Sequence, residues 1–131
     1  MRVLALDHGA ARCGVAVSDP TGSLATPLEA VAAPDTRKGM AAIAALVRER
    51  EVDRVVVGLP LTLAGEEGGQ AQEARGFASR LAEKLPGVAV ELWDERLTSV
   101  QAGRTGGAAS EDSRAAAHLL EAWLAAQGEH A

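Results

Sequence analysis

The chain opens with short apolar runs separated by turn residues, a pattern typical of β-strands. Residues 2–7 and 13–18 are two such runs, and the HGAA segment between them is short enough for a hairpin. Gly9 in this segment permits a positive φ. After a DPTGS turn, a less regular run follows at 24–32, where Pro27 favours a strand at the edge of a sheet. The beginning of the chain therefore predicts a three-stranded antiparallel meander.

The hydrophobic period then changes, and helical spacing alternates with short buried runs. The predicted helices cover about 36–50, 70–85, 98–104 and 111–127, and the further strands cover 53–60 and 88–93. Helices that join parallel strands in one sheet make right-handed crossovers. We therefore expect a single α/β domain over residues 1–131. Its five-stranded mixed sheet has the first strand at the centre and the second strand antiparallel, and helices flank it.

Composition supports an ordinary globular core. Hydrophobic residues make up 47% of the 131 residues, and Cys13 is the single cysteine, which fits a reducing compartment. The sequence lacks a signal-peptide pattern and any apolar run near the ~18 residues of a membrane span. We therefore expect a cytoplasmic protein with no membrane association.

Candidate chemistry lies where the strands end. Asp7 closes the predicted central strand, at the carboxyl edge where open α/β sheets carry their sites. The last strand ends at the same edge in Asp94-Glu95-Arg96, and Glu95 has the longer reach. At ~4.8 Å per strand, Asp7 and Glu95 start ~10 Å apart, too far for direct contact but bridgeable through a divalent ion. Asp19 ends the antiparallel strand ~20 Å away, which excludes it from this site.

A third acid can come from the last predicted helix. Asp112 continues the apolar stripe of that helix at helical spacing, so it faces the sheet. An acid on a buried face needs a partner, and carboxylates alone suit Mg²⁺ or Mn²⁺. Two such ions activate a water and stabilise the leaving oxygen of a phosphodiester. Plainer interpretations stay open: Asp7 as a turn residue, Glu95 as a surface acid paired with Arg96, and Asp112 as a residue favoured by the helix dipole.

Two arginines lie close enough to the predicted site to contact phosphate. Arg12 lies in the turn after Asp7, and Arg96 follows Glu95. Arginine suits bidentate contacts with phosphate, whereas a structural ion pair of Arg96 with Asp94 is the alternative. The net charge of −5 argues against a protein that coats nucleic acid, but not against an enzyme that holds metal ions at clustered acids.

Four segments together resemble a known family. They are LALDHGAARCGVAVSD, VVVGLPLTLAGEEGGQA, DERLTS and DSRAAAHLLEAWL, and they are similar to the four motifs of the YqgF/RuvX family of Holliday junction resolvases and pre-16S rRNA nucleases. The resemblance implies an RNase H-like fold and metal-dependent cleavage of structured nucleic acid in the bacterial cytoplasm. It also implies a role in maturing the 5′ end of the small-subunit rRNA precursor. Carried over by motif, its acids are Asp7, Glu95 and Asp112. The loop TGGAASED before the last motif lacks the Lys or Arg that family members usually carry there.

Several functions stay open on the sequence alone. The first is a two-metal nuclease that processes pre-16S rRNA in ribosome biogenesis, or one that resolves four-way DNA junctions by the same chemistry. The second is a nucleotide phosphotransferase of the actin class, which would need two such domains rather than one. The third is a non-catalytic RNA-binding ribosome-assembly factor, favoured by the acidic charge and the base-free loop. A resolvase would be a symmetric dimer, and the sequence leaves monomer or homodimer open.

Overall fold

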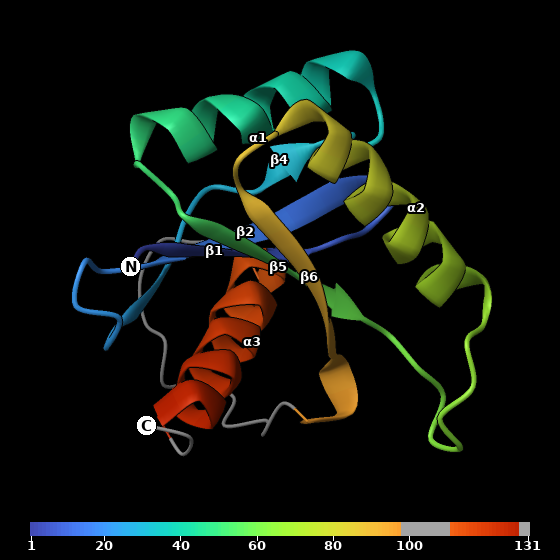
Figure 1. Cartoon of the computed structure of the whole chain (residues 1–131). Coiled ribbons are helices and arrows are strands. Elements are labelled where there is room, and N and C mark those ends of the chain that lie inside the picture. The colour runs from blue at the N-terminus through green and yellow to red at the C-terminus, as the bar shows by residue number, and fades with distance from the viewer. Residues whose placement is uncertain (98–110, 129–131) are drawn as a thin grey trace.

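The computed structural model of the chain describes residues 1–97 and 111–128 (Figure 1). The elements are β1 (Val3–Asp7), β2 (Arg12–Ser18), β3 (Ala25–Pro27), β4 (Val31–Ala32), α1 (Arg37–Glu49), β5 (Arg54–Leu59), α2 (Gly69–Lys84), β6 (Ala89–Asp94), a 3₁₀ turn (Glu95–Leu97) and α3 (Glu111–Gly128). The predicted helix at 98–104, with its Thr98 and Gln101 capping box, lies outside the described residues. No helix among the described residues is long and apolar enough to cross a membrane.

The strands form one mixed sheet, as predicted. Its order is β3-β2-β1-β5-β6, with β1 at the centre, antiparallel to β2 and parallel to β5. β6 is parallel to β5, so β1, β5 and β6 all end at the same edge. The two residues at the end of β1 pair with β2 and β5: Asp7 lies opposite Gly14, and Leu6 lies opposite Val57. The parallel order of β1, β5 and β6 therefore brings residues from distant parts of the chain to one edge, where the carboxyl ends of these strands lie.

The third predicted strand is interrupted in the structure, which raises the strand count to six. Ala16 pairs with Pro27 in β3, whereas Cys13 pairs with Val31 in β4. From one pair to the other, β2 covers three residues and the neighbouring segment covers four, and such an extra residue is a β-bulge. The bulge follows Pro27, which has no N–H to donate to the ladder. A hydrophobic pattern does not record this extra residue.

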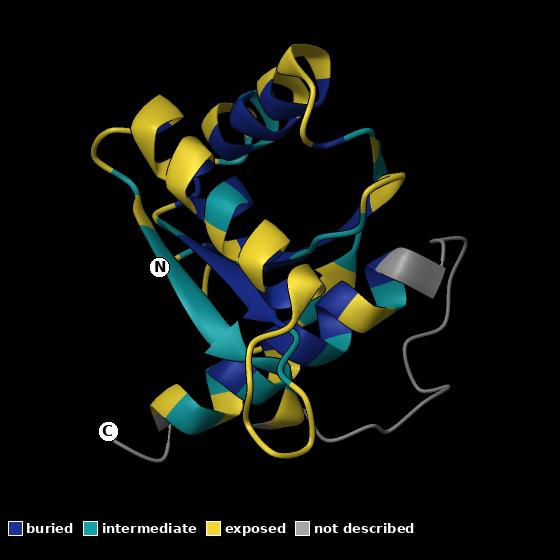
Figure 2. Cartoon of the chain, turned by 90° about the vertical axis from the view of Figure 1, so that its right-hand side faces the viewer, coloured by how far each residue is buried: buried dark blue, intermediate teal, exposed yellow. Residues whose placement is uncertain are grey.

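The helices lie in two layers on opposite faces of the sheet. Figure 1 shows α1 and α2 over one face and α3 over the other. Leu4 and Leu6 of β1 pack with the first layer, and Val3 and Ala5 pack with α3, because successive side chains alternate faces. The predicted apolar stripe of the last helix is buried as expected: Ala116, Leu119, Leu120 and Trp123. Figure 2 shows the buried strands inside and the exposed outer faces of the helices.

Thr36 and Gly68 precede the first two helices, and Gly9 lies in the turn after β1. Thr36 caps α1, because its Oγ1 accepts a hydrogen bond from the N–H of Gly39 at 3.0 Å. Gly68 is the N-cap residue of α2, which begins at Gly69 without a side-chain cap. Gly9 does not adopt the positive φ that the sequence suggested. It is required for another reason, because a Cβ there would lie 2.7 Å from the carbonyl oxygen of Arg12.

Candidate active site

Asp7 and Glu95 meet at the carboxyl edge of the sheet. Asp7 is the last residue of β1, and Glu95 is the first residue after β6, two strands away. Their side chains are joined by a hydrogen bond. The expectation that strand spacing keeps them out of direct contact is therefore wrong.

Gly58 in β5 is the reason for this contact. It follows Val57, the partner of Leu6, and so lies in the strand between the two acids. A Cβ built on Gly58 would come within 3.0 Å of Cγ and Cδ of Glu95. The Glu95 side chain thus lies over a place where the middle strand has none, and this lets its carboxyl group reach Asp7. A glycine within a strand often marks such a close approach.

The electrostatics of the pair are unfavourable for two ionised carboxylates. Burial raises the pKa of Glu95 to about 7, helped by the negative charge of Asp7, by the hydrogen bond to Asp7 and by the charge of Asp94. A hydrogen bond between two carboxyl groups needs a proton on one of them, so the pair holds one proton when this bond is made. At about pH 7 the Glu95 carboxyl group is therefore near its titration midpoint, and a cation could replace its proton.

Asp94 and Arg96 form an ion pair beside Glu95. Nη2 of Arg96 donates to Oδ2 of Asp94 at 2.7 Å, and Nε donates to the same carboxylate at 3.1 Å. This contact with the guanidinium holds the pKa of Asp94 below its ordinary value. Nη1 of Arg96 lies 3.4 Å from the carbonyl oxygen of Leu63, which is exposed in the loop between β5 and α2. The structural ion pair weighed for Arg96 is therefore present, and the guanidinium remains partly exposed.

The other predicted site residues lie on neighbouring elements. Arg12 is exposed at the start of β2, directly after the turn that follows Asp7. Asp112 belongs to the first turn of α3, and its side chain lies outside the described residues. The next residue, Ser113, is fully buried, and its Oγ accepts a hydrogen bond from the N–H of Val15 at 3.2 Å. Because Val15 pairs with Leu6, the first turn of α3 lies beside the end of β1.

Sequence reasoning missed a polar network next to Asp7, in which only the His8 side chain is buried. The His8 side chain is 4% exposed, and its Nε2 lies 2.9 Å from Oδ2 of Asp35. Asp35 also accepts from Nη2 of Arg80 in α2 at 2.6 Å, and the His8 ring packs against Phe77 at 4.7 Å between centroids. The network ties the turn after β1 to the segment before α1 and to α2. No local pattern signals it, because its members come from three separate segments.

The chemistry of the Asp7–Glu95 pair fits a hard divalent cation. Carboxylate oxygens are the ligands of Mg²⁺ and Mn²⁺, and a cation would offset the burial and the repulsion by Asp7 that raise the pKa of Glu95. Among residues whose side chains the structure describes, no group of three His, Cys, Asp or Glu residues could hold a metal ion. The pair thus supplies two ligands, and the predicted third, Asp112, lies outside that search.

The sheet order, the two helix layers and the acids at the carboxyl edge define an RNase H-like fold. The structure is similar to *Thermus thermophilus* RuvC in complex with a Holliday junction substrate, with a TM-score of 0.64 and 17% identity over 100% of this chain and 98% of that one. It is also similar to a second structure of *T. thermophilus* RuvC, with a TM-score of 0.58 and 19% identity over 98% of this chain and 97% of that one. At these identities the likeness shows the fold alone.

Sequence comparison then gives the family. A family model described as RuvX: Holliday junction resolvase matches residues 1–126, and the chain belongs to this family. A *Nocardia farcinica* relative is 45% identical over 94% of this chain and 77% of its own length. An *Anaeromyxobacter* relative is 44% identical over the whole of both chains. Both are named "Putative pre-16S rRNA nuclease". The predicted fold class and family resemblance are confirmed.

Proposed function

We propose that the chain is a metal-dependent endonuclease that hydrolyses phosphodiester bonds in structured nucleic acid. The observation that carries the proposal is the direct contact of Asp7 with Glu95 over Gly58, where burial and the charge of Asp7 raise the pKa of Glu95 to about 7. Family membership and the RNase H-like fold support the same reaction class.

The acids of the carboxyl edge are the proposed catalytic residues and metal ligands. Asp7 and Glu95 hold Mg²⁺ or Mn²⁺, and Asp112 completes the set from the first turn of α3. A bound divalent ion would lower the pKa of a coordinated water and offset charge on the phosphate, and we extend the proposal to two such ions. Glu95 must release its proton to act as a ligand, and its pKa near 7 makes this release inexpensive in neutral solution. The Ser113–Val15 hydrogen bond supports the participation of Asp112, because it anchors the neighbouring residue beside β1.

Arg12 and Arg96 are the proposed phosphate contacts. Both are exposed and flank the acid pair in sequence and in the fold. The Asp94 carboxylate holds the Arg96 guanidinium in place while leaving part of it open to solvent. A pre-ordered guanidinium loses less side-chain entropy when it binds a phosphate oxygen.

The proposed substrate is the 5′ region of the 16S rRNA precursor, within ribosome biogenesis in the cytoplasm. The names of the relatives favour this substrate. The family description favours the second candidate, a four-way DNA junction. Hydrolysis of RNA and of DNA phosphodiesters uses the same ligands, so substrate choice depends on the surfaces around the acids rather than on the acids themselves.

Cleavage assays test the proposal. Purified protein is incubated with a labelled pre-16S rRNA fragment or a four-way DNA junction, in Mg²⁺, Mn²⁺ or EDTA. We expect metal-dependent cleavage that Asp7→Asn or Glu95→Gln lowers by about a hundredfold or more, because loss of a ligand exceeds the loss of an outer-shell contact. Glu121→Gln, on the exposed side of α3, is the matched control.

Two results would contradict the nuclease proposal. One is cleavage that persists in EDTA or in the Asp7→Asn variant. The other is salt-dependent RNA binding with no turnover in either metal, which would favour a non-catalytic assembly factor.

A further inference from the structure

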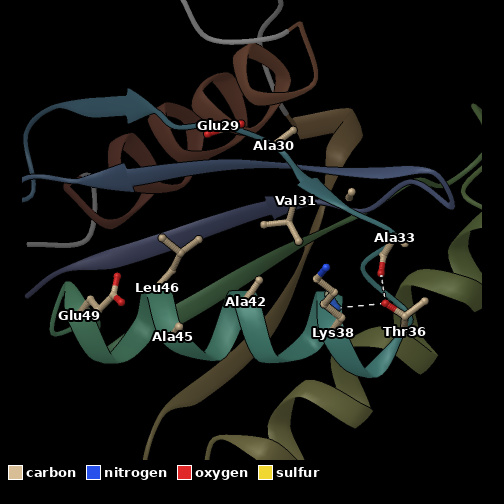
Figure 3. A pocket seen from close by; sticks show the side chains of 12 residues that line it. Glu29, Ala30, Val31, Ala33, Thr36, Lys38, Ala42, Ala45, Leu46 and Glu49 are labelled. Atoms are coloured by element: carbon tan, nitrogen blue, oxygen red, sulfur yellow. Dashed lines mark hydrogen bonds between the residues drawn. The ribbon is translucent and has the colours of Figure 1, made fainter.

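A second surface lies apart from the acid pair, at the edge of the sheet. A groove of about 570 Å³ runs between α1 and the segment around β4 (Figure 3). Its floor is apolar and consists mainly of Ala30, Val31, Ala42, Ala45 and Leu46. None of the proposed site residues lines it.

Charged side chains stand at the two ends of the α1 side of this groove. Lys38 lies near the start of the helix and Glu49 at its last residue, and both are exposed. Figure 3 shows them on the same side of the helix, with Ala42 and Leu46 between them. They are eleven residues apart, or roughly 16 Å along the helix, which is too far for a pair within one chain. Neither takes part in an ion pair among residues 1–97 and 113–127.

The order of residues along α1 is self-complementary. Lys38 and Glu49 are equally far from the midpoint between residues 43 and 44, and so are Ala42 and Ala45. A second α1 laid antiparallel across this face about a two-fold axis would place Lys38 opposite Glu49 of the partner subunit. Ala42 would lie opposite Ala45 of the partner subunit, and small side chains there allow two helices to approach closely. Such reciprocity is the property of a two-fold dimer interface.

We propose that the groove between α1 and β4 binds a second copy of this chain, through antiparallel α1 helices and two reciprocal Lys38–Glu49 ion pairs. The inference does not depend on the nuclease proposal, because it uses no residue of the acid site. A helix of 13 residues is roughly 20 Å long, so one helix pair with its groove walls falls at the small end of protein interfaces. The dimer is therefore weak and reversible, with a dissociation constant on the order of micromolar or above.

Sedimentation velocity measures this association directly. The wild-type protein is compared from about 5 to about 500 µM with Lys38→Glu, Glu49→Lys and the double variant K38E/E49K. We expect a concentration-dependent dimer in the wild type, with its dissociation constant raised about tenfold by either single reversal, which opposes like charges. The double variant should recover the wild-type constant. Because the two residues cannot pair within one copy, this recovery can arise only between copies.

Controls keep the test decisive. Lys84→Glu reverses a charge at the end of α2, outside the groove, and should leave the dissociation constant unchanged. Circular dichroism verifies that each variant, changed only at exposed positions, keeps its fold. A wild type that stays monomeric over the whole range would overturn the proposal and leave the groove to a different partner. A dimer indifferent to both reversals, or a double variant that does not recover, would also overturn it.

Discussion

Acidic side chains follow strands at both edges of the sheet, and their surroundings differ sharply. Asp19 follows β2, and its Oδ1 accepts hydrogen bonds from the N–H groups of Ser23 and Leu24, each at 2.8 Å. The Thr21 hydroxyl donates to Oδ2 of the same carboxylate, and this bond with the two backbone donors holds the pKa of Asp19 well below its ordinary value. Glu95 follows β6, and its burial, together with the charge of the Asp7 carboxyl group beside it, raises its pKa to about 7. The surroundings of Asp19 stabilise its negative charge, whereas the surroundings of Glu95 disfavour a negative charge.

This difference separates a structural acid from a candidate functional one. A carboxylate surrounded by donors stabilises a turn and needs nothing further. A half-buried pair of carboxyl groups is unfavourable in the isolated chain, and such strain is typical of sites that complete themselves with a cation or substrate. Both acids carry a carboxyl group and directly follow a strand. The surrounding donors, and not the acids, distinguish the two edges.

The largest effect is expected when a side chain fills the space at Gly58 and separates Glu95 from Asp7. Gly58→Ala places a Cβ against Glu95, so the flexible Glu95 side chain must move away from Asp7. We expect nuclease activity to fall by about 10- to 100-fold, as when a ligand loses its correct orientation, with little change in Tm. Gly69→Ala is the control, because a Cβ there meets no atom within 4 Å. Full activity in Gly58→Ala would show that Glu95 need not lie over β5.

The two edges should also respond oppositely to pH. The unfolded chain releases the Glu95 proton near pH 4.5, whereas the folded chain keeps it until about pH 7. The stabilisation from this group is therefore complete below about pH 4.5 and is lost as the pH rises through 7. Its loss costs the metal-free protein about 2 kcal/mol of unfolding free energy by pH 8, after allowance for partial exposure of the side chain.

Denaturant unfolding in EDTA at pH 5 and pH 8 measures this loss. The decrease should be smaller in Glu95→Gln, whose amide does not titrate. Adding Mg²⁺ at pH 8 should restore stability to the wild type more than to the variant. Equal pH dependence in the two proteins would mean that Glu95 does not titrate with folding.

Substitution of Asp19 should lower stability without lowering nuclease activity. Asp19→Ala removes the acceptor for two backbone N–H groups, so we expect Tm to fall by about 2–6 °C. The pKa of Asp19 is lowered, so its stabilising contribution is present above its unfolded pKa and is lost only in acid. The fall in Tm should therefore be the same at pH 5 and pH 8, and the cleavage rate should not change. A large loss of cleavage would mean that the antiparallel edge also contributes to the site.

Much of this architecture follows from the sequence, because it depends on period and chain direction. The central position of β1, the antiparallel β2 and the buried stripe of α3 are such features. Strand spacing alone, however, puts Asp7 and Glu95 out of contact, since it assumes a side chain on every intervening strand. The glycine in the run VVVGL was the signal that would have corrected this.

Other features depend on residues that only the fold brings together. The bulge after Pro27 changes register by a single residue, which a hydrophobic pattern does not resolve. Asp35 bonds both His8 and Arg80, and so joins three distant segments. The sequence could not decide whether Arg96 pairs with Asp94 or contacts phosphate, because both interactions use the same guanidinium. The structure shows the ion pair with Asp94 and leaves the Arg96 side chain partly exposed.

The smallest effect is expected for substitution of Arg96, which tests whether this residue contacts phosphate beside the acid pair. Arg96→Gln removes one cation beside the acid pair, so we expect nucleic-acid affinity to fall by about 3- to 10-fold. The slope of log K against log salt should decrease by about one, as for the loss of a single phosphate contact. Tm should change by no more than about 1 °C, because an exposed ion pair contributes little stability. Lys84→Gln removes the same charge far along α2 and should leave the slope unchanged. A variant that alters Tm but not affinity would assign Arg96 to the support of Asp94 alone, and the edge would then contact phosphate through Arg12.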